Sequence, residues 1–115
     1  MPFRPSEAAL PLTPIAFEIL LALVEEDRHG YAILQAVEQR LKGRLPLRTG
    51  TLYRALARLV EDGFIVELDG DPGEDGRRRV YRITRRGRTI ARAESERLAD
   101  QVAAARSRNL LPGRS

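Results

Sequence analysis

Apolar residues recur along this chain at the spacing of one helix face, and the pattern predicts four helices. The helices are expected over residues 14–26, 31–41, 49–62 and 84–106. Thr13-Pro14 precedes the first and Thr84 precedes the last, as capping residues do. Residues 64–68 and 79–83 are β-prone or alternate basic with apolar residues, and a turn-rich segment separates them. These two stretches predict a β-hairpin with a long tip.

The first predicted helix is apolar on almost every side, with Glu18 as the one charged residue inside its apolar run. A helix at the surface of a small domain needs only one apolar face. Two arrangements are compatible with this pattern. The helix lies at the centre of the core, or its second face meets another subunit.

The third predicted helix is the most regular and has two distinct faces. Its apolar face consists of Leu52, Leu56, Leu59 and Val60. Arg54 and Arg58 project from the opposite side, next to the small residues Gly50 and Ala57. That outer face is suited to approach a partner closely and to reach into it with arginine side chains.

Composition excludes several kinds of site. The chain has 115 residues, no Cys and one His, which excludes disulfides, thiolate zinc sites and a His-rich metal cage. No paired nucleophile and base is recognisable, so we expect no enzyme, no cofactor and no metal. Residues 15–24 form the longest apolar stretch and are too short to span a bilayer. With no signal-peptide pattern at the start, the chain is expected in the cytoplasm.

Charge is distributed unevenly along the chain. The formal net charge is only +4, but residues 44–92 carry 12 basic and 7 acidic side chains, a net of +5. All but one of the 20 basic residues are Arg, which binds phosphates and guanine edges in a bidentate manner. Nucleic acid is therefore the first partner to consider. The alternative is that these arginines only form an ordinary solvated surface.

Three helices, a hairpin and a closing helix follow one another as in a winged helix-turn-helix, whose third helix enters the DNA major groove. Arg54 and Arg58 are the expected base-contacting residues, and the arginines before the second strand are expected on the phosphate backbone. Four acidic residues in the hairpin tip should point away from DNA. The predicted DNA-binding residues are Arg48, Thr49, Gly50, Thr51, Tyr53, Arg54, Arg58, Arg77, Arg78 and Arg79.

Several short runs resemble the signatures of the PadR-type winged-helix transcriptional regulators. They are His29-Gly30-Tyr31, Gly50-Thr51-Leu52-Tyr53, Glu61-Asp62-Gly63-Phe64 and Tyr81-Arg82-Ile83-Thr84, and the match covers roughly residues 12–90. The resemblance implies a homodimeric DNA-binding repressor whose first and last helices form the dimer interface. The resemblance also implies that the effectors differ from one member of the family to another. This chain departs from the family where Arg48-Thr49 replaces a common Ser-Pro and where Arg54 replaces a Pro.

The expected fold is mainly α with a small β-hairpin: a winged helix-turn-helix with a C-terminal dimerisation helix. Residues 1–11 should form a flexible arm, 12–88 the DNA-binding domain, 89–109 the dimerisation helix and 110–115 a disordered tail. The residues expected at the dimer interface are Ile15, Phe17, Ile19, Leu20, Leu23, Ala91, Leu98, Val102 and Ala105. Most of that interface is expected from the first helix, because the stripe on the last helix is thin.

The functional prediction is a sequence-specific DNA-binding regulator, a repressor that binds an inverted-repeat operator as a homodimer. The alternative is a protein-interaction adaptor with the same fold and no specific DNA target. A small-molecule effector of unknown identity is a further expected partner. Tyr31, Tyr53, Tyr81 and Phe17 are expected to pack in the core, with an effector pocket between subunits as the alternative.

Overall fold

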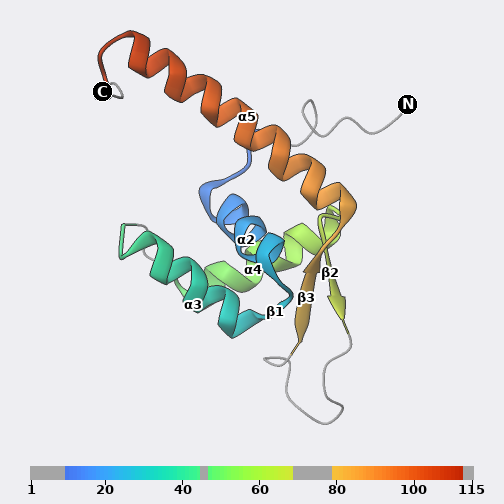
Figure 1. The fold of residues 1–115 in the computed structure, drawn as a ribbon. Coiled ribbons are helices and arrows are strands. Elements are labelled where there is room, and N and C mark those ends of the chain that lie inside the picture. Colours follow the sequence, from blue (N-terminus) through green and yellow to red (C-terminus); the bar gives the residue numbers. More distant parts are fainter. Residues whose placement is uncertain (1–9, 45–46, 69–78, 113–115) are drawn as a thin grey trace.

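A computed structural model of the chain describes residues 10–44, 47–68 and 79–112 (Figure 1). Within these segments four helices and three short strands follow one another. They are α2 (Pro14–Glu25), β1 (Arg28–His29), α3 (Gly30–Leu41), α4 (Thr49–Glu61), β2 (Ile65–Leu68), β3 (Val80–Ile83) and α5 (Arg85–Ser107). The predicted winged-helix order and each predicted helix are confirmed.

Helix α2 occupies the centre of the molecule (Figure 1). The hydroxyl of Thr13 accepts a hydrogen bond from the backbone N–H of Ala16 at 3.1 Å and so caps the helix start. Helices α3, α4 and α5 and strand β3 all contact α2. Ile19, Leu20 and Leu23 are at most 1% exposed, so the all-round apolar pattern reflects a central core helix.

The sheet has three strands, whereas the sequence predicted a two-stranded hairpin. Arg28 and His29 lie between the first two predicted helices, and they pair antiparallel with β3, with Arg28 opposite Tyr81. Strand β2 pairs with the other edge of β3, with Ile65 opposite Ile83, so the strand order is β1-β3-β2. A two-residue strand carries no alternating pattern of its own, and only its pairing with β3 defines it.

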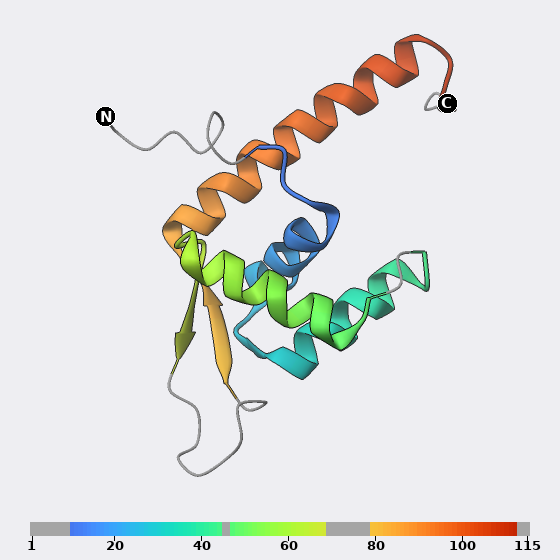
Figure 2. The same cartoon turned by 180° about the vertical axis from the view of Figure 1, so that it is seen from behind.

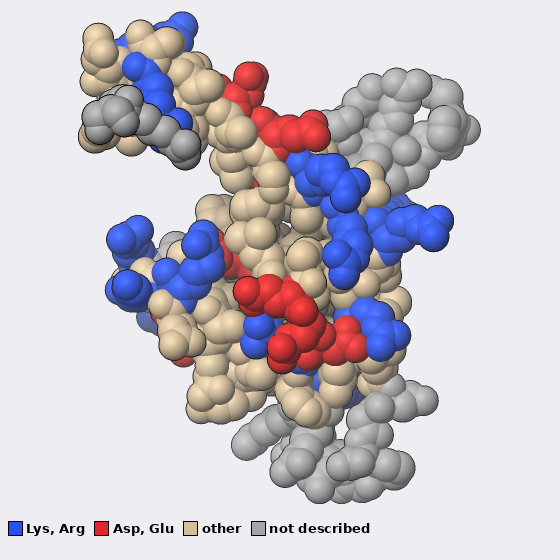
Figure 3. Space-filling view, in the orientation of Figure 1, with Lys and Arg blue, Asp and Glu red and all other residues tan. Residues whose placement is uncertain are grey.

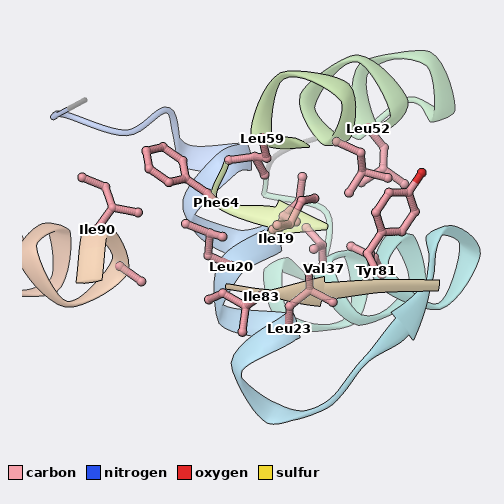
Figure 4. Packing of buried hydrophobic residues seen from close by; sticks show 14 of the residues in the cluster. Ile19, Leu20, Leu23, Val37, Leu52, Leu59, Phe64, Tyr81, Ile83 and Ile90 are labelled. Carbon is pink, nitrogen blue, oxygen red and sulfur yellow. The ribbon is translucent and has the colours of Figure 1, made fainter. Parts of the chain in front are cut away.

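The start of α5 packs closely against the end of α4 and is hydrogen-bonded to the turn that follows it. The hydroxyl of Thr84 accepts from the backbone N–H of Gly87 at 3.0 Å and donates to the carbonyl oxygen of Gly63 at 2.7 Å. A Cβ atom at Gly87 would overlap the carbonyl oxygen of Phe64, so only glycine permits this approach. Figure 4 shows Ile90 of α5 pointing toward Phe64 and Leu20, which joins α5 to the core.

The outer half of α5 extends beyond the rest of the molecule (Figure 1). On its first turns Ile90 and Ala91 are buried, and α5 continues without a break across the boundary expected between residues 88 and 89. The same helix face continues as Leu98, Val102 and Ala105, where Val102 is 39% exposed. An apolar stripe that is buried near the body therefore lies open at the far end.

Candidate nucleic-acid interface

Helix α4 divides into a buried face and an outer face as its sequence predicts. Leu52, Leu56 and Leu59 are at most 3% exposed and pack into the core. The outer face, by which we mean the solvent-exposed side of α4, consists of Gly50, Arg54, Ala57, Arg58 and Glu61. Figure 2 shows α4 crossing the front of the molecule with no other helix in front of it. A single helix presented in this way fits the major groove of DNA, which is about 12 Å wide.

The start of α4 has no side-chain cap. Arg48 occupies the N-cap position but makes no capping hydrogen bond through its side chain, and Thr49 and Gly50 are exposed. The first N–H groups of a helix have no partner within it, and they lie at the positive end of the helix dipole. This end of α4 is therefore suited to a phosphate group, with the hydroxyl of Thr49 beside it.

The two arginines of the outer face differ in their partners. The Nε of Arg58 lies 3.3 Å from Oδ2 of Asp62 one turn later, and both side chains are exposed. Arg54 has only a long contact of 3.4 Å from Nη2 to the hydroxyl of Thr51, and no acidic side chain among the described residues pairs with it. Arg54 therefore carries the more available guanidinium group.

Tyr53 lies on the flank of α4 that faces α3, away from the outer face. A Cβ atom added at Gly30 would lie 2.8 Å from the Tyr53 hydroxyl oxygen, so the phenol packs directly against the first residue of α3. This contact sets the distance between the starts of α3 and α4. The predicted core packing is confirmed for Tyr53 and for Tyr81, which is 5% exposed.

The same prediction was wrong for Tyr31, whose side chain is 60% exposed. The buried stripe of α3 runs through Gly30, Ile33 and Val37, and Tyr31 lies to one side of it. Helical spacing alone left that side undefined, because only contact with α2 and α4 decides which flank of α3 is covered.

Strands β2 and β3 form the wing, and the arginines in and next to β3 are already paired with acidic residues. Arg79 lies 3.1 Å from a carboxylate oxygen of Glu67, and Arg82 lies 2.8 Å from one of Asp27. The Asp27 carboxylate raises the pKa of Arg82, mainly through hydrogen bonds and further through its charge. Of the predicted wing residues, Arg77 and Arg78 and the acidic Asp69, Asp71, Glu74 and Asp75 lie outside the described residues.

The apolar residues that remain available to a second subunit differ from those expected at the dimer interface from the sequence. Four residues of that set are already buried within one chain and have no surface to offer; these are Ile19, Leu20, Leu23 and Ala91. On α2 the apolar side chains that keep some exposure along one face are Phe17 and Leu21, which are half-buried, and Val24, which is exposed; they are spaced four and three residues apart. The sequence contains this spacing, but it does not distinguish these three residues from the apolar residues around them.

Other classes of site have little support in the described segments. No group of three or more His, Cys, Asp or Glu side chains in residues 10–44, 47–68 and 79–112 is arranged to hold a metal ion. Among the same residues no helix combines the length and the apolar character needed to cross a membrane.

Sequence comparison identifies a family. The model of the transcriptional regulator PadR-like family matches residues 19–93. An uncharacterized protein from Lysinibacillus sphaericus is 36% identical over 70 residues, which cover 61% of this chain and 64% of that protein. An uncharacterized 37.1 kDa protein in a transposon of Streptomyces fradiae is 38% identical over 81 residues, which cover 70% of this chain and 22% of that protein. The chain spans less than two thirds of the length of either relative.

Solved structures share the fold. A transcriptional regulator from Clostridium thermocellum has a TM-score of 0.69 at 29% identity, covering 81% of this chain and 87% of that one. A PadR family regulator from Clostridium difficile has a TM-score of 0.72 at 24% identity, covering 83% and 97%. Bacillus subtilis PadR in complex with operator DNA has a TM-score of 0.61 at 21% identity, covering 70% and 45%. The chain therefore belongs to the PadR-like family of winged-helix transcriptional regulators, whose members are not enzymes.

Proposed function

We propose that this chain is a cytoplasmic repressor that binds an inverted-repeat operator as a homodimer, with α4 in the major groove. The observation that carries the proposal is the outer face of α4, which presents Arg54 and Arg58 on a helix whose other face is buried. Arginine forms two parallel hydrogen bonds to O6 and N7 of guanine. Bacillus subtilis PadR, a protein of the same fold, has been solved in complex with operator DNA, which supports DNA binding by this fold.

Different groups around α4 have different roles in this proposal. Arg54 is the principal base-contacting residue because the described chain offers it no acidic partner. Arg58 joins it after separating from Asp62, which costs little because exposed ion pairs contribute about 0–1 kcal/mol. The residues at the helix start contact the phosphate backbone, and they are Arg48, Thr49, Gly50 and Thr51.

Flanking positions complete the proposed DNA contact. Arg77, Arg78 and Arg79 contact the backbone beside the operator, with Arg79 exchanging Glu67 for a phosphate. Tyr53 contributes indirectly, since its packing against Gly30 holds α4 at a set distance from α3. Loss of the Tyr53 ring should therefore weaken binding to every DNA sequence alike.

Two open apolar surfaces support a homodimer. The first is the α2 face made by the half-buried Phe17 and Leu21 and the exposed Val24. The second is the α5 stripe of Leu98, Val102 and Ala105, which extends beyond the body. Burying this surface against a second copy removes it from water. A two-fold symmetric dimer places its two α4 helices on half-sites roughly 34–36 Å apart, one turn of DNA.

Selection of bound sequences from a random DNA pool, followed by titration of the selected duplex at several salt concentrations, tests the proposal. We expect an inverted repeat and an affinity that falls steeply and log-linearly with salt, because bound phosphates release counterions. Arg54→Ala should cost about 1–3 kcal/mol of binding free energy and relax the preference at one base pair. Arg106→Ala removes the same charge from an exposed site at the far end of α5 and serves as the control.

Two results would contradict the proposal. An affinity that does not respond to salt would show that phosphate contacts do not drive binding. A monomer that selects no DNA sequence would favour the adaptor alternative, in which the arginines only keep the surface solvated.

A further inference from the structure

The outward side of α5 carries arginines over the first turns of the helix. Residues 85–92 contain four arginines and no acidic residue. Three of them, Arg85, Arg88 and Arg92, follow one another at spacings of three and four residues and are exposed. They therefore lie along one side of the helix, opposite the buried Ile90. We call these three residues the α5 arginine row.

Within the described part of the chain, no acidic side chain forms an ion pair with Arg85, Arg88 or Arg92. Glu96 lies one turn after Arg92, where the α5 arginine row ends. Like charges three and four residues apart on a helix repel one another. The first turn of α5 also holds no acidic residue, although it is the positive end of the helix dipole. The α5 arginine row therefore costs the folded chain stability, and an anionic partner would offset this cost.

The α5 arginine row and the outer face of α4 point to different sides of the molecule. The side of α5 that faces the end of α4 carries Arg86, whose guanidinium carbon lies 5.8 Å from the centre of the Phe64 ring. Arg88 follows two residues later and is turned from Arg86 by about 200° around the helix. Figure 2 shows α4 from behind, whereas Figure 3 shows basic side chains over the first half of α5 from the front. A DNA duplex held by α4 would therefore leave the α5 arginine row open.

We propose that the α5 arginine row binds the phosphate backbone of a second DNA segment, without preference for its sequence. Guanidinium groups bind phosphate oxygens through charge-assisted hydrogen bonds. Arg85 and Arg92 are separated by about 10 Å along the helix axis. DNA carries one negative charge per about 1.7 Å of its axis, so several phosphates lie within this length.

This second contact gives the proposed repressor a further activity, and this part of the inference rests on the proposed function. Each subunit of the dimer carries one α5 arginine row that points away from its α4. A dimer that holds its operator through α4 then holds a second duplex through α5. The protein thereby bridges two DNA segments.

Other anionic partners match this surface less well. All exposed residues between positions 85 and 92 are Arg or Thr, so the surface contains no exposed apolar side chain. Protein interfaces depend on a few buried anchors, often aromatic, and helices that lie on membranes insert apolar side chains. Binding to a DNA backbone without sequence preference needs only positive charge. The composition of the surface therefore favours DNA.

A titration with random-sequence duplex tests the α5 arginine row independently of the proposed function. The starting variant is Arg54→Ala/Arg58→Ala, which removes both arginines from the outer face of α4. It should still bind the labelled duplex, with an affinity that falls log-linearly with salt. Adding Arg88→Gln/Arg92→Gln should weaken this binding at least about tenfold. The slope of log affinity against log salt should become shallower by about 2, because each lost phosphate contact removes about 0.9.

The matched control adds Arg106→Gln/Arg108→Gln to the same starting variant. It removes the same charge from two exposed residues at the far end of the described chain and should change neither affinity nor slope. All four substituted positions are exposed, so each variant should fold, which circular dichroism verifies. A starting variant that does not bind the random-sequence duplex would overturn the proposal. Equal effects of the two pairs of substitutions would overturn it as well.

Vesicles containing phosphatidylserine and a polyglutamate peptide represent the other anionic partners. The starting variant should bind both more weakly than the duplex. If either one binds through Arg88 and Arg92 while the duplex does not, the surface belongs to a membrane or to an acidic protein, and the assignment to DNA is wrong.

A capture experiment measures the bridging and separates it from the proposed function. Random-sequence duplex is fixed to beads, and the wild type should carry its labelled, selected operator onto them. Arg88→Gln/Arg92→Gln should bind that operator in solution with the wild-type sequence preference but should leave at least about tenfold less of it on the beads. If the wild type binds each duplex but never both together, the bridging is overturned. If no operator is selected at all, the proposed function fails, while the titration of the starting variant still decides whether the α5 arginine row binds DNA.

Discussion

Two glutamates are buried in the described part of the chain, and each is neutralised by an arginine that reaches it from the surface. Glu18 of α2 accepts hydrogen bonds from Arg40 of α3 at 2.7 and 3.0 Å. Glu94 accepts from Arg97 one turn later on α5 at 2.6 and 3.0 Å, and the carboxylate raises the pKa of Arg97, chiefly through this hydrogen bond. The Glu18–Arg40 pair thereby joins two helices, whereas the Glu94–Arg97 pair lies within α5.

Replacement of Arg40 tests the pair that joins α2 to α3. Arg40→Met keeps most of the side-chain length but leaves the Glu18 carboxylate, whose side chain is 10% exposed, without its partner. We expect a loss of about 1–2 kcal/mol in the free energy of unfolding, measured by urea denaturation. Arg44→Met, at an exposed position just after α3, is the control. Equal stability of the two variants would show that Glu18 does not depend on Arg40.

Tyr81 gives the stability of the chain a pH dependence in the alkaline range. Burial of its ring raises the pKa of the phenol above the ordinary value of 10.0, and the charge of Glu67 adds to this. The folded chain holds this proton more tightly than the unfolded chain does. Stability from Tyr81 is therefore complete below about pH 10 and is lost as the pH rises through the raised pKa.

The variant Tyr81→Phe removes this titration. From about pH 10 upward the free energy of unfolding of the wild type should fall more steeply than that of Tyr81→Phe. Urea denaturation across this range measures both slopes. Parallel slopes would assign the alkaline loss of stability to other groups.

At the scale of elements, the contact between the end of α4 and the start of α5 positions α4 relative to the strands β2 and β3. Gly63 adopts a positive φ of 79°, which turns the chain from α4 into β2. The backbone N–H of Thr84 donates to the carbonyl oxygen of Phe64 at 3.0 Å, and the first turn of α5 rests on the same residue. A change in this contact should therefore move α4, β2 and α5 together.

Gly87→Ala tests this contact. Its methyl group would overlap the Phe64 carbonyl, so α5 must shift, and we expect a loss of about 2 kcal/mol or more in the free energy of unfolding. The same substitution at Gly50, an exposed helical position whose nearest neighbour is the Arg54 side chain, is the control for stability. It should leave stability unchanged or raise it by up to about 1 kcal/mol. A stable Gly87→Ala would mean that the helices are not packed this closely.

At the scale of the whole molecule, basic, acidic and open apolar surfaces lie on different parts of the chain. Figure 3 shows basic side chains gathered over the first half of α5, acidic ones where α2 leads into β1, and the outer half of α5 standing clear of the body. Residues 79–92 contain six arginines and no acidic residue. The outer half of α5, by contrast, carries the open apolar stripe that the proposed dimer would cover.

A charge placed on that stripe should disrupt the dimer. Val102→Glu puts a carboxylate on the stripe, whereas Ala103→Glu puts it on the exposed side of the same helix turn. We expect the first variant to raise the dimer dissociation constant at least about tenfold, because burial would desolvate the charge, and the second to leave it unchanged. Light scattering after size-exclusion chromatography gives the mass of each. A dimeric Val102→Glu at all concentrations would exclude the stripe from the interface.

Much of the fold follows from local patterns. The leucines of α4 predicted its buried face and so its outer face, because a helix repeats every 3.6 residues whatever surrounds it. Thr13 and Thr84 predicted where α2 and α5 begin, because a hydroxyl at the cap satisfies an N–H group of the first turn. The position of Arg54 and Arg58 on the outer face was therefore visible before any tertiary contact was known.

Contacts between elements decided the rest. Local spacing cannot say that Leu23 is buried within one chain while Val24 is exposed, because α2 is apolar on both sides and its neighbours choose the faces. Nor can it show that β3 lies between β1 and β2. The sequence by itself determined which helices form and which face of α4 is polar, since these depend on neighbours three or four residues away. Only the tertiary structure determined which apolar faces remain open, because that depends on residues distant in the chain.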